Sequence, residues 1–150
     1  MSHTIETKVA TPDDAGAIAD IVRGLAGENV GLPDSFTDPN RVAEWLKRLG
    51  EGGCVLLAYV GSIPVAFAAL DYNTMEPETA TIGVWVLPEH RRRGLATMLA
   101  DGLLEAARER GYRRIRGRLP EGNEPALSFL SSIGAMVPLR NPNMTFELPL

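Results

Sequence analysis

The chain has 150 residues, of which 45% are hydrophobic and 23% are charged, a composition that suits one compact domain over residues 1–150 with its own core. Its formal net charge of −4 argues against a nucleic-acid-binding protein, because such domains carry a surplus of basic residues. The single cysteine excludes an internal disulfide, and the histidines have no acidic cluster at ligand spacing, so we expect no metal site.

The sequence offers no segment suited to a membrane. Its first residues lack the apolar core of a signal peptide, and the longest apolar run, near Val65 to Leu70, is too short to cross a bilayer. We therefore expect a cytoplasmic protein without membrane contact.

Periodicity and turn residues predict the elements in chain order. Apolar and polar residues alternate in strands, Thr-Pro and Asp-Pro pairs begin helices, and a Gly-Ser pair marks a hairpin. The first half contains a strand at 4–9, a helix at 11–27, a loop at 28–40, a helix at 38–49, and strands at 54–60 and 63–72. The second half contains a strand at 79–86, a helix at 95–110, a strand at 113–119, a short helix at 124–133, and two short strands after residue 135.

These elements predict a mixed α/β (α+β) fold. A helix connects the strands at 79–86 and 113–119, so these two strands should be parallel, whereas short connections make consecutive strands antiparallel. We expect a central mixed, mostly antiparallel, twisted sheet of about six to seven strands, flanked by four helices.

The segment at 86–97 breaks the usual charge pattern of a helix start. Acidic or capping residues are favoured at the positive end of a helix, yet Arg91, Arg92 and Arg93 stand immediately before Gly94 here. An anion would resolve this conflict, because backbone N–H groups at a helix start bind phosphate oxygens and arginines add charge-assisted bonds. The pattern indicates a phosphate or pyrophosphate site, and a solvated basic patch is the alternative.

Two patterns carry a resemblance to a known family. Val86-x-Pro88-x-x-Arg91-x-x-Gly94-x-Ala96 resembles the acyl-coenzyme A signature of the GNAT superfamily of N-acetyltransferases. Farther along, Asn123-x-x-Ala126-x-x-Phe129-x-x-x-x-Gly134 resembles the later Asn-x-x-Ala helix and closing glycine of that family. The resemblance spans nearly the whole chain, and it implies that the two parallel central strands splay apart and admit the coenzyme.

The resemblance also implies which residues contact acetyl-coenzyme A, the expected cosubstrate. It implies no metal. The backbone at Val84 and Val86 would lie beside the pantetheine arm and the thioester. The following turn would hold the pyrophosphate, and the later helix would complete the site with Asn123 and Phe129. The turn residues concerned are Arg91, Arg92, Arg93, Gly94, Leu95, Ala96 and Thr97.

The resemblance leaves the proton-transfer groups open. Many family members place a tyrosine one residue after the position of Phe129, where this chain has Leu130, and no acid stands between Glu78 and Glu89. Tyr72 as the acid and Glu78 as the base, acting through a water, are the candidate replacements. Each also has a structural reading, Tyr72 as a strand end and Glu78 as a turn charge. Weaker options are Ser128 and Ser131.

The leading hypothesis is an N-acetyltransferase, an acyltransferase that acts on a small or peptidic primary amine by direct attack on the thioester. A non-catalytic acyl-coenzyme A sensor or interaction module is the alternative that Leu130 favours, and a nucleotide-binding module is a third. The acids Asp71, Glu76 and Glu78 would suit a cationic acceptor, or are solvated turn charges. The sequence leaves the acceptor, the pathway and the formation of a homodimer open.

Overall fold

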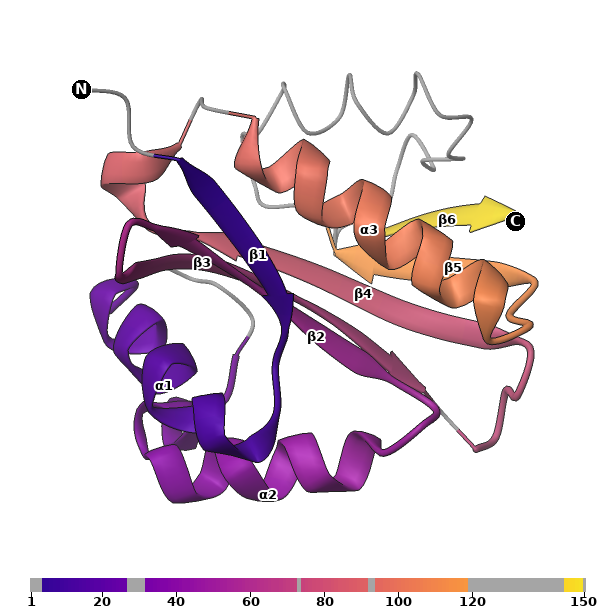
Figure 1. The fold of residues 1–150 in the computed structure, drawn as a ribbon. Helices are drawn as coiled ribbons and strands as arrows, with labels where there is room; N and C mark the ends of the chain where they lie inside the picture. The colour runs from indigo at the N-terminus through magenta and orange to yellow at the C-terminus, as the bar shows by residue number, and fades with distance from the viewer. Residues whose placement is uncertain (1–3, 27–31, 73, 92–93, 119–144, 150) are drawn as a thin grey trace.

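The structure, a computed structural model, describes residues 4–26, 32–72, 74–91, 94–118 and 145–149 (Figure 1). These residues form one six-stranded sheet in the order β1-β2-β3-β4-β5-β6. All neighbouring strands are antiparallel except β4 and β5, which are parallel as the sequence predicts. The strands are β1 (Ile5–Val9), β2 (Cys54–Val60), β3 (Ile63–Tyr72), β4 (Thr79–Val86), β5 (Arg114–Arg118) and β6 (Thr145–Pro149).

Helices cover both faces of this sheet. Helix α3 (Leu95–Glu109) lies on one face, and α1 (Ala15–Gly24) and α2 (Pro39–Leu49) lie on the other (Figure 1). Short 3₁₀ turns precede each of them, namely η1 (Pro12–Asp14), η2 (Asp34–Thr37) and η3 (Pro88–His90). The result is a three-layer α/β arrangement, which buries both faces of the central strands.

Local chemistry explains where the first two helices begin. Pro12 begins η1 and Pro39 begins α2, because a proline in the first turn sacrifices no helical hydrogen bond. Asp38 also caps α2, since its side chain accepts a hydrogen bond from the Asn40 N–H at 2.9 Å. Both predicted helix starts are therefore confirmed, although the segment predicted as one helix at 11–27 is η1 followed by α1, which ends at Gly24.

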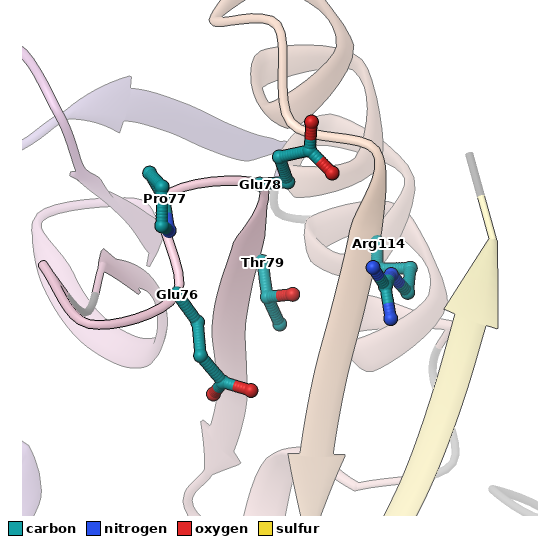
Figure 2. A pocket seen from close by; sticks show the side chains of 5 residues that line it. All are labelled: Glu76, Pro77, Glu78, Thr79 and Arg114. Atoms are coloured by element: carbon teal, nitrogen blue, oxygen red, sulfur yellow. The ribbon is translucent and has the colours of Figure 1, made fainter.

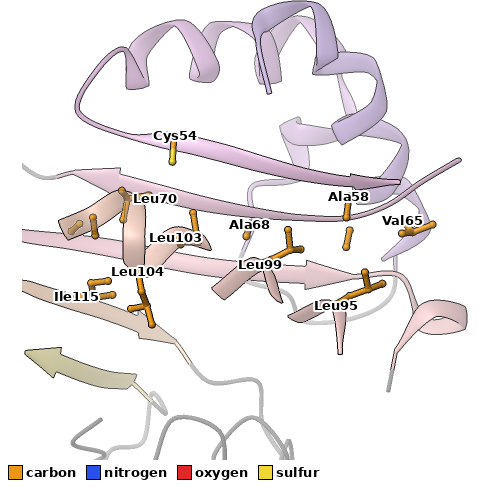
Figure 3. Packing of buried hydrophobic residues seen from close by; sticks show 13 residues of the cluster. Cys54, Ala58, Val65, Ala68, Leu70, Leu95, Leu99, Leu103, Leu104 and Ile115 are labelled. Atoms are coloured by element: carbon orange, nitrogen blue, oxygen red, sulfur yellow. The ribbon is translucent and has the colours of Figure 1, made fainter. Parts of the chain in front are cut away.

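The core consists of two hydrophobic clusters separated by the sheet. Alternate residues of β3 face opposite ways: Ala68 and Leu70 belong to the cluster under α3, and Phe67 and Ala69 to the cluster under α1 and α2. This double burial explains why residues 65–70 of β3 are all apolar. Figure 3 shows the first cluster, in which α3 packs Leu95, Leu99 and Leu103 toward the sheet.

Cys54 also belongs to the cluster under α3 and is only 8% exposed. Burial raises the pKa of its thiol, because an apolar environment disfavours the thiolate. The thiol is therefore part of the core.

The expected counts of strands and helices are not matched element for element. The described residues contain six strands and three α-helices, with three short 3₁₀ turns that the sequence did not predict as separate elements. The predicted helix at 124–133 and the first of the two short strands predicted after residue 135 lie outside the described residues.

Candidate active site

Strands β4 and β5 pair over only half the length of β4. The parallel pairing joins residues 79–82 to residues 114–117, and β4 then runs on through residues 83–86. Among the described strands, none pairs with this second half of β4 on the side away from β3. Backbone N–H and C=O groups on this edge can therefore hydrogen-bond to another extended chain.

The chain turns from the end of β4 into α3 through η3. Gly94 precedes the first residue of α3 with a φ of 78°, in the left-handed region that a glycine adopts without strain. A Cβ built on Gly94 would have no heavy atom within 4 Å, so the space in front of this residue is open. The position thus combines a special backbone conformation with free access from outside.

The first turn of α3 offers hydrogen-bond donors without a capping side chain. The first helical hydrogen bond runs from the Met98 N–H to the Gly94 carbonyl at 3.0 Å, so the N–H groups of Leu95, Ala96 and Thr97 have no acceptor within the helix. The first turn contains no acidic residue. These donors stand at the positive end of a 15-residue helix, which favours an anion.

The residues predicted to hold the pyrophosphate differ in how they are exposed and bonded. Leu95 is 1% exposed and packs in the core, so only its backbone faces outward, whereas Ala96 and Thr97 are exposed. The Arg91 Nε donates a hydrogen bond to the Val86 carbonyl at 3.2 Å, which ties the turn to the end of β4. Arg92 and Arg93 lie outside the described residues.

The side chains of β4 divide between the two faces of the sheet. Val84 and Val86 are partly buried and pack against the cluster under α3. Trp85 lies on the opposite face, where its ring stacks on Phe67 with centroids 4.8 Å apart. Gly83 lies under the Trp85 ring, since a Cβ there would collide with it. The sequence analysis did not use this pair, although a glycine within a strand often marks such a close approach.

Asp71 of β3 is the centre of a polar group on the face that carries α1 and α2. Its carboxylate accepts hydrogen bonds from Arg48 Nη2 at 2.9 Å and from the Tyr72 N–H at 2.7 Å, and Trp45 Nε1 lies 3.4 Å away. Asp71 stands opposite Thr81 of β4, at the level where β4 and β5 are still paired. These donors hold the Asp71 side chain against α2.

The two predicted catalytic residues stand near the beginning of β4, far from the turn between β4 and α3: Tyr72 ends β3, and Glu78 immediately precedes β4. Tyr72 stands opposite Ala80, and its hydroxyl donates a hydrogen bond to the Arg48 carbonyl at 2.9 Å. Val86 comes six positions after Ala80, which corresponds to about 20 Å of extended strand. The structure therefore brings Tyr72 and Glu78 to one end of the sheet and Val86 and Gly94 to the other.

Glu78 lines an open pocket of about 300 Å³ at the beginning of β4. The lining residues are Glu76, Pro77, Glu78, Thr79 and Arg114 (Figure 2). Figure 2 shows the carboxylates of Glu76 and Glu78 pointing away from each other. Glu78 Oε1 lies 3.7 Å from Arg113 Nε, and Glu76 forms a 2.8 Å ion pair with Arg116. Both carboxylates thus have cationic neighbours.

Several predicted site residues cannot be located. Asn123, Phe129, Ser128, Leu130 and Ser131 all lie outside the described residues. Within the part of the chain that the structure describes, no three His, Cys, Asp or Glu side chains gather into a candidate metal site. The helices of that part include none that is both long and apolar enough to cross a bilayer.

Comparison with family models identifies the family. Residues 22–135 match the model described as the Acetyltransferase (GNAT) family, and this match covers most of the chain. The chain therefore belongs to the GNAT acetyltransferase family, as the two sequence patterns indicate. A comparison with curated protein sequences found no match.

Solved structures of similar fold extend over nearly the whole chain. The protein yncA from Salmonella typhimurium, solved with its cofactor acetyl-CoA, has a TM-score of 0.80 at 20% identity, covering 97% of this chain and 94% of that one. The ribosomal-protein-alanine N-acetyltransferase from Brucella melitensis has a TM-score of 0.82 at 19% identity, covering 97% and 99% of the two chains. A phosphinothricin acetyltransferase from Sinorhizobium meliloti, in complex with AcCoA, has a TM-score of 0.80 at 15% identity, covering 100% and 89%. At these identities the likeness establishes the shared fold.

Proposed function

We propose that this protein is an acetyl-coenzyme A-dependent N-acetyltransferase that acetylates a primary amine by direct attack on the thioester. The observation that carries the proposal is the arrangement at the end of β4: a strand edge that no other described strand pairs with leads into the start of α3, where the first N–H groups have no acceptor within the helix. Membership of the GNAT family and the acetyl-CoA named with two similar structures support the same cosubstrate.

The chain's own groups fit the two parts of such a cosubstrate. The backbone N–H groups of Leu95, Ala96 and Thr97 would hold the pyrophosphate at the positive end of α3. The edge of β4 at residues 83–86 would hydrogen-bond to the extended pantetheine arm. This placement would leave the thioester beside the middle of β4, where an amine can approach from the face that carries Thr81 and Trp85.

The reaction forms a bond between the amine nitrogen and the acetyl carbonyl carbon and breaks the carbon–sulfur bond. The nitrogen loses one proton, and the departing sulfur takes one up. A backbone N–H on β4 would polarise the carbonyl, and positioning of the two reactants supplies a large part of the rate. Acetyl-coenzyme A supplies the activated acyl group, and no redox step is involved.

Thermal denaturation and thiol release test the proposal together. Acetyl-coenzyme A should raise the melting temperature more than ATP or NAD does, and a panel of primary amines should contain at least one that releases free thiol from acetyl-coenzyme A. Stabilisation by acetyl-coenzyme A without thiol release from any amine would favour the non-catalytic sensor. Stronger stabilisation by ATP or NAD would favour the nucleotide-binding module.

The roles first proposed for Tyr72 and Glu78 have their own test. Tyr72 stands opposite Ala80 and Glu78 immediately precedes β4, and the Tyr72 hydroxyl donates to the Arg48 carbonyl. We expect Tyr72→Phe and Glu78→Gln to keep kcat within about threefold of the wild type, because about 10 Å of extended strand separates Ala80, the partner of Tyr72, from Gly83, where the proposed cosubstrate edge begins. A loss of about a hundredfold in kcat at unchanged melting temperature would restore them as proton-transfer residues.

A further inference from the structure

A second hollow, of about 350 Å³, lies between η2 and α2. Its α2 residues recur at positions three and four apart, so they share one face of that helix. The lining residues are Ser35, Phe36, Arg41, Glu44, Trp45 and Arg48.

This hollow lies beside the sheet surface where the acceptor would approach. Trp45 and Arg48 both contact Asp71 of β3, which stands opposite Thr81 of β4. Phe36 and Trp45 pack at the margin of the core cluster that also includes Trp85. The hollow is therefore on the face of the sheet that carries α1 and α2, beside Asp71 of β3, whose partner Thr81 stands one residue before the pairing of β4 with β5 ends.

The hollow combines an aromatic wall with guanidinium groups. The rings of Phe36 and Trp45 lie 5.0 Å apart at 43°, a tilted pair that presents apolar surface. Arg41 and Arg48 stand on the same face of α2, seven residues and about 10 Å apart along the helix axis. A ligand that fits both features has an apolar or aromatic part and an acidic group.

Arg41 and Arg48 differ in how firmly their guanidinium groups are held by neighbouring carboxylates. Arg48 is held by both oxygens of Asp71, at 2.9 Å and 3.5 Å. Arg41 has one 3.3 Å contact with Glu44, and these two side chains are 62% and 68% exposed. Such an exposed contact is weak, so an incoming carboxylate can replace Glu44 as the partner of Arg41.

The charged side chains that line the hollow are two arginines, Arg41 and Arg48, and one carboxylate, Glu44. Asp71 beside it is hydrogen-bonded to Arg48 and the Tyr72 N–H, so a cationic acceptor would have to displace Arg48 to reach that carboxylate. The charges of the hollow therefore favour an acidic acceptor over the cationic one that the acids at 71–78 suggest from the sequence.

Resting on the proposed transferase function, we infer that the acceptor is a primary amine that also carries a carboxylate and an apolar or aromatic side chain, as a free apolar α-amino acid does. Arg41 binds the carboxylate, the Phe36–Trp45 wall binds the side chain, and the amine faces β4. Arg41 is thus a specificity-determining residue that contacts the acceptor.

Steady-state kinetics with matched amines test this inference. Phenylalanine and phenethylamine share a ring and an amine and differ in the carboxylate, while spermidine represents the cationic class. We expect kcat/KM for phenylalanine to exceed that for phenethylamine by about tenfold or more, as a charge-assisted hydrogen bond allows. Arg41→Gln should remove this preference by raising KM for phenylalanine alone, and Glu44→Gln should strengthen it.

Lys47→Gln is the matched control, because Lys47 is an exposed cation of the same helix that does not line the hollow. It should leave the preference for phenylalanine unchanged. An equal loss for both amines in Arg41→Gln, or a wild-type preference for phenethylamine or spermidine, would overturn the inference while leaving the transferase function intact.

A binding measurement separates failure of the inference from failure of the proposed function. If no amine is acetylated, the transferase proposal fails, and phenylalanine binding in the presence of coenzyme A is then followed by NMR titration. Binding that Arg41→Gln abolishes and Lys47→Gln keeps would support the acceptor site. Absence of phenylalanine binding would overturn it.

Discussion

Gly94 and Gly83 show that the same type of residue can serve two different purposes in one region of the fold. Gly94 supplies a positive φ in open space, whereas Gly83 supplies room for the Trp85 ring. The first purpose could be predicted, because a glycine at the start of a helix after three arginines has a physical explanation in anion binding. The second could not, because the stacking of Trp85 on Phe67 depends on the pairing of β3 with β4.

A pair of alanine substitutions tests the role of Gly83. Gly83→Ala should lower the free energy of unfolding by about 1–3 kcal/mol, because the added Cβ forces the Trp85 ring to move. Gly16→Ala is the control, since a Cβ at this exposed position of α1 meets nothing within 4 Å; it should be neutral or stabilise by up to about 1 kcal/mol. Urea denaturation measures both, and equal effects of the two substitutions would contradict the packing described here.

Asp14 gives a residue-scale prediction on pH. Burial disfavours its charged form, but hydrogen bonds from the Thr11 N–H at 2.8 Å and Lys8 Nζ at 2.9 Å outweigh burial and lower the pKa of this carboxyl below its ordinary value of 3.8. A depressed folded-state pKa stabilises the protein above the ordinary value, and this contribution is lost as the pH falls through the folded-state pKa.

Asp14→Asn should therefore cost about 1 kcal/mol of unfolding free energy at pH 7, and the cost should shrink as the pH falls below about 3.8. Asp13→Asn removes a charge from the same turn and is the control, with a smaller expected cost. Denaturation of both variants from pH 7 to pH 3 measures the difference. A cost for Asp14→Asn that does not change with pH would contradict the role of the ionised carboxylate.

At the scale of elements, the sequence predicts long periodic segments well and short or tertiary features poorly. The three described α-helices and the hairpin of β2 and β3 follow from periodicity, Pro-containing helix starts and the Gly61-Ser62 turn. The four-residue turn η2 was expected as loop, because it is too short for a periodic pattern. The positions of Tyr72 and Glu78 were beyond sequence reasoning, because nothing local in the sequence indicates that they stand beside the beginning of β4, at the opposite end of that strand from Val86.

The half-paired strand β4 gives a prediction for hydrogen exchange. Amides of residues 83–86 that face away from β3 should exchange faster in the free protein than the paired amides of residues 79–82. Acetyl-coenzyme A should protect the first group and leave the second nearly unchanged. NMR-detected exchange resolves these amides, and uniform protection of β4 in the free protein would contradict an open edge.

At the scale of the whole molecule, the fold explains why the site lies where it does. A single parallel pair in a mostly antiparallel sheet requires a crossover helix, and that helix, α3, directs its N-terminus toward the end of β4. The strand edge and the helix start are therefore adjacent because of chain connectivity. The sequence predicts the parallel pair, the family resemblance implies the splay, and the structure adds the aromatic and arginine-lined hollow on the face of α1 and α2.

Calorimetric titration with acetyl-coenzyme A tests most directly whether the start of α3 binds the cosubstrate. The wild type should bind, and Gly94→Asp should lose measurable binding, because the new carboxylate brings charge and bulk into the site of the pyrophosphate. Gly111→Asp is the matched control: Gly111 follows the other end of α3 with a φ of 82° and open space around it, so it should keep affinity within about threefold. Equal binding by Gly94→Asp and the wild type would contradict the account.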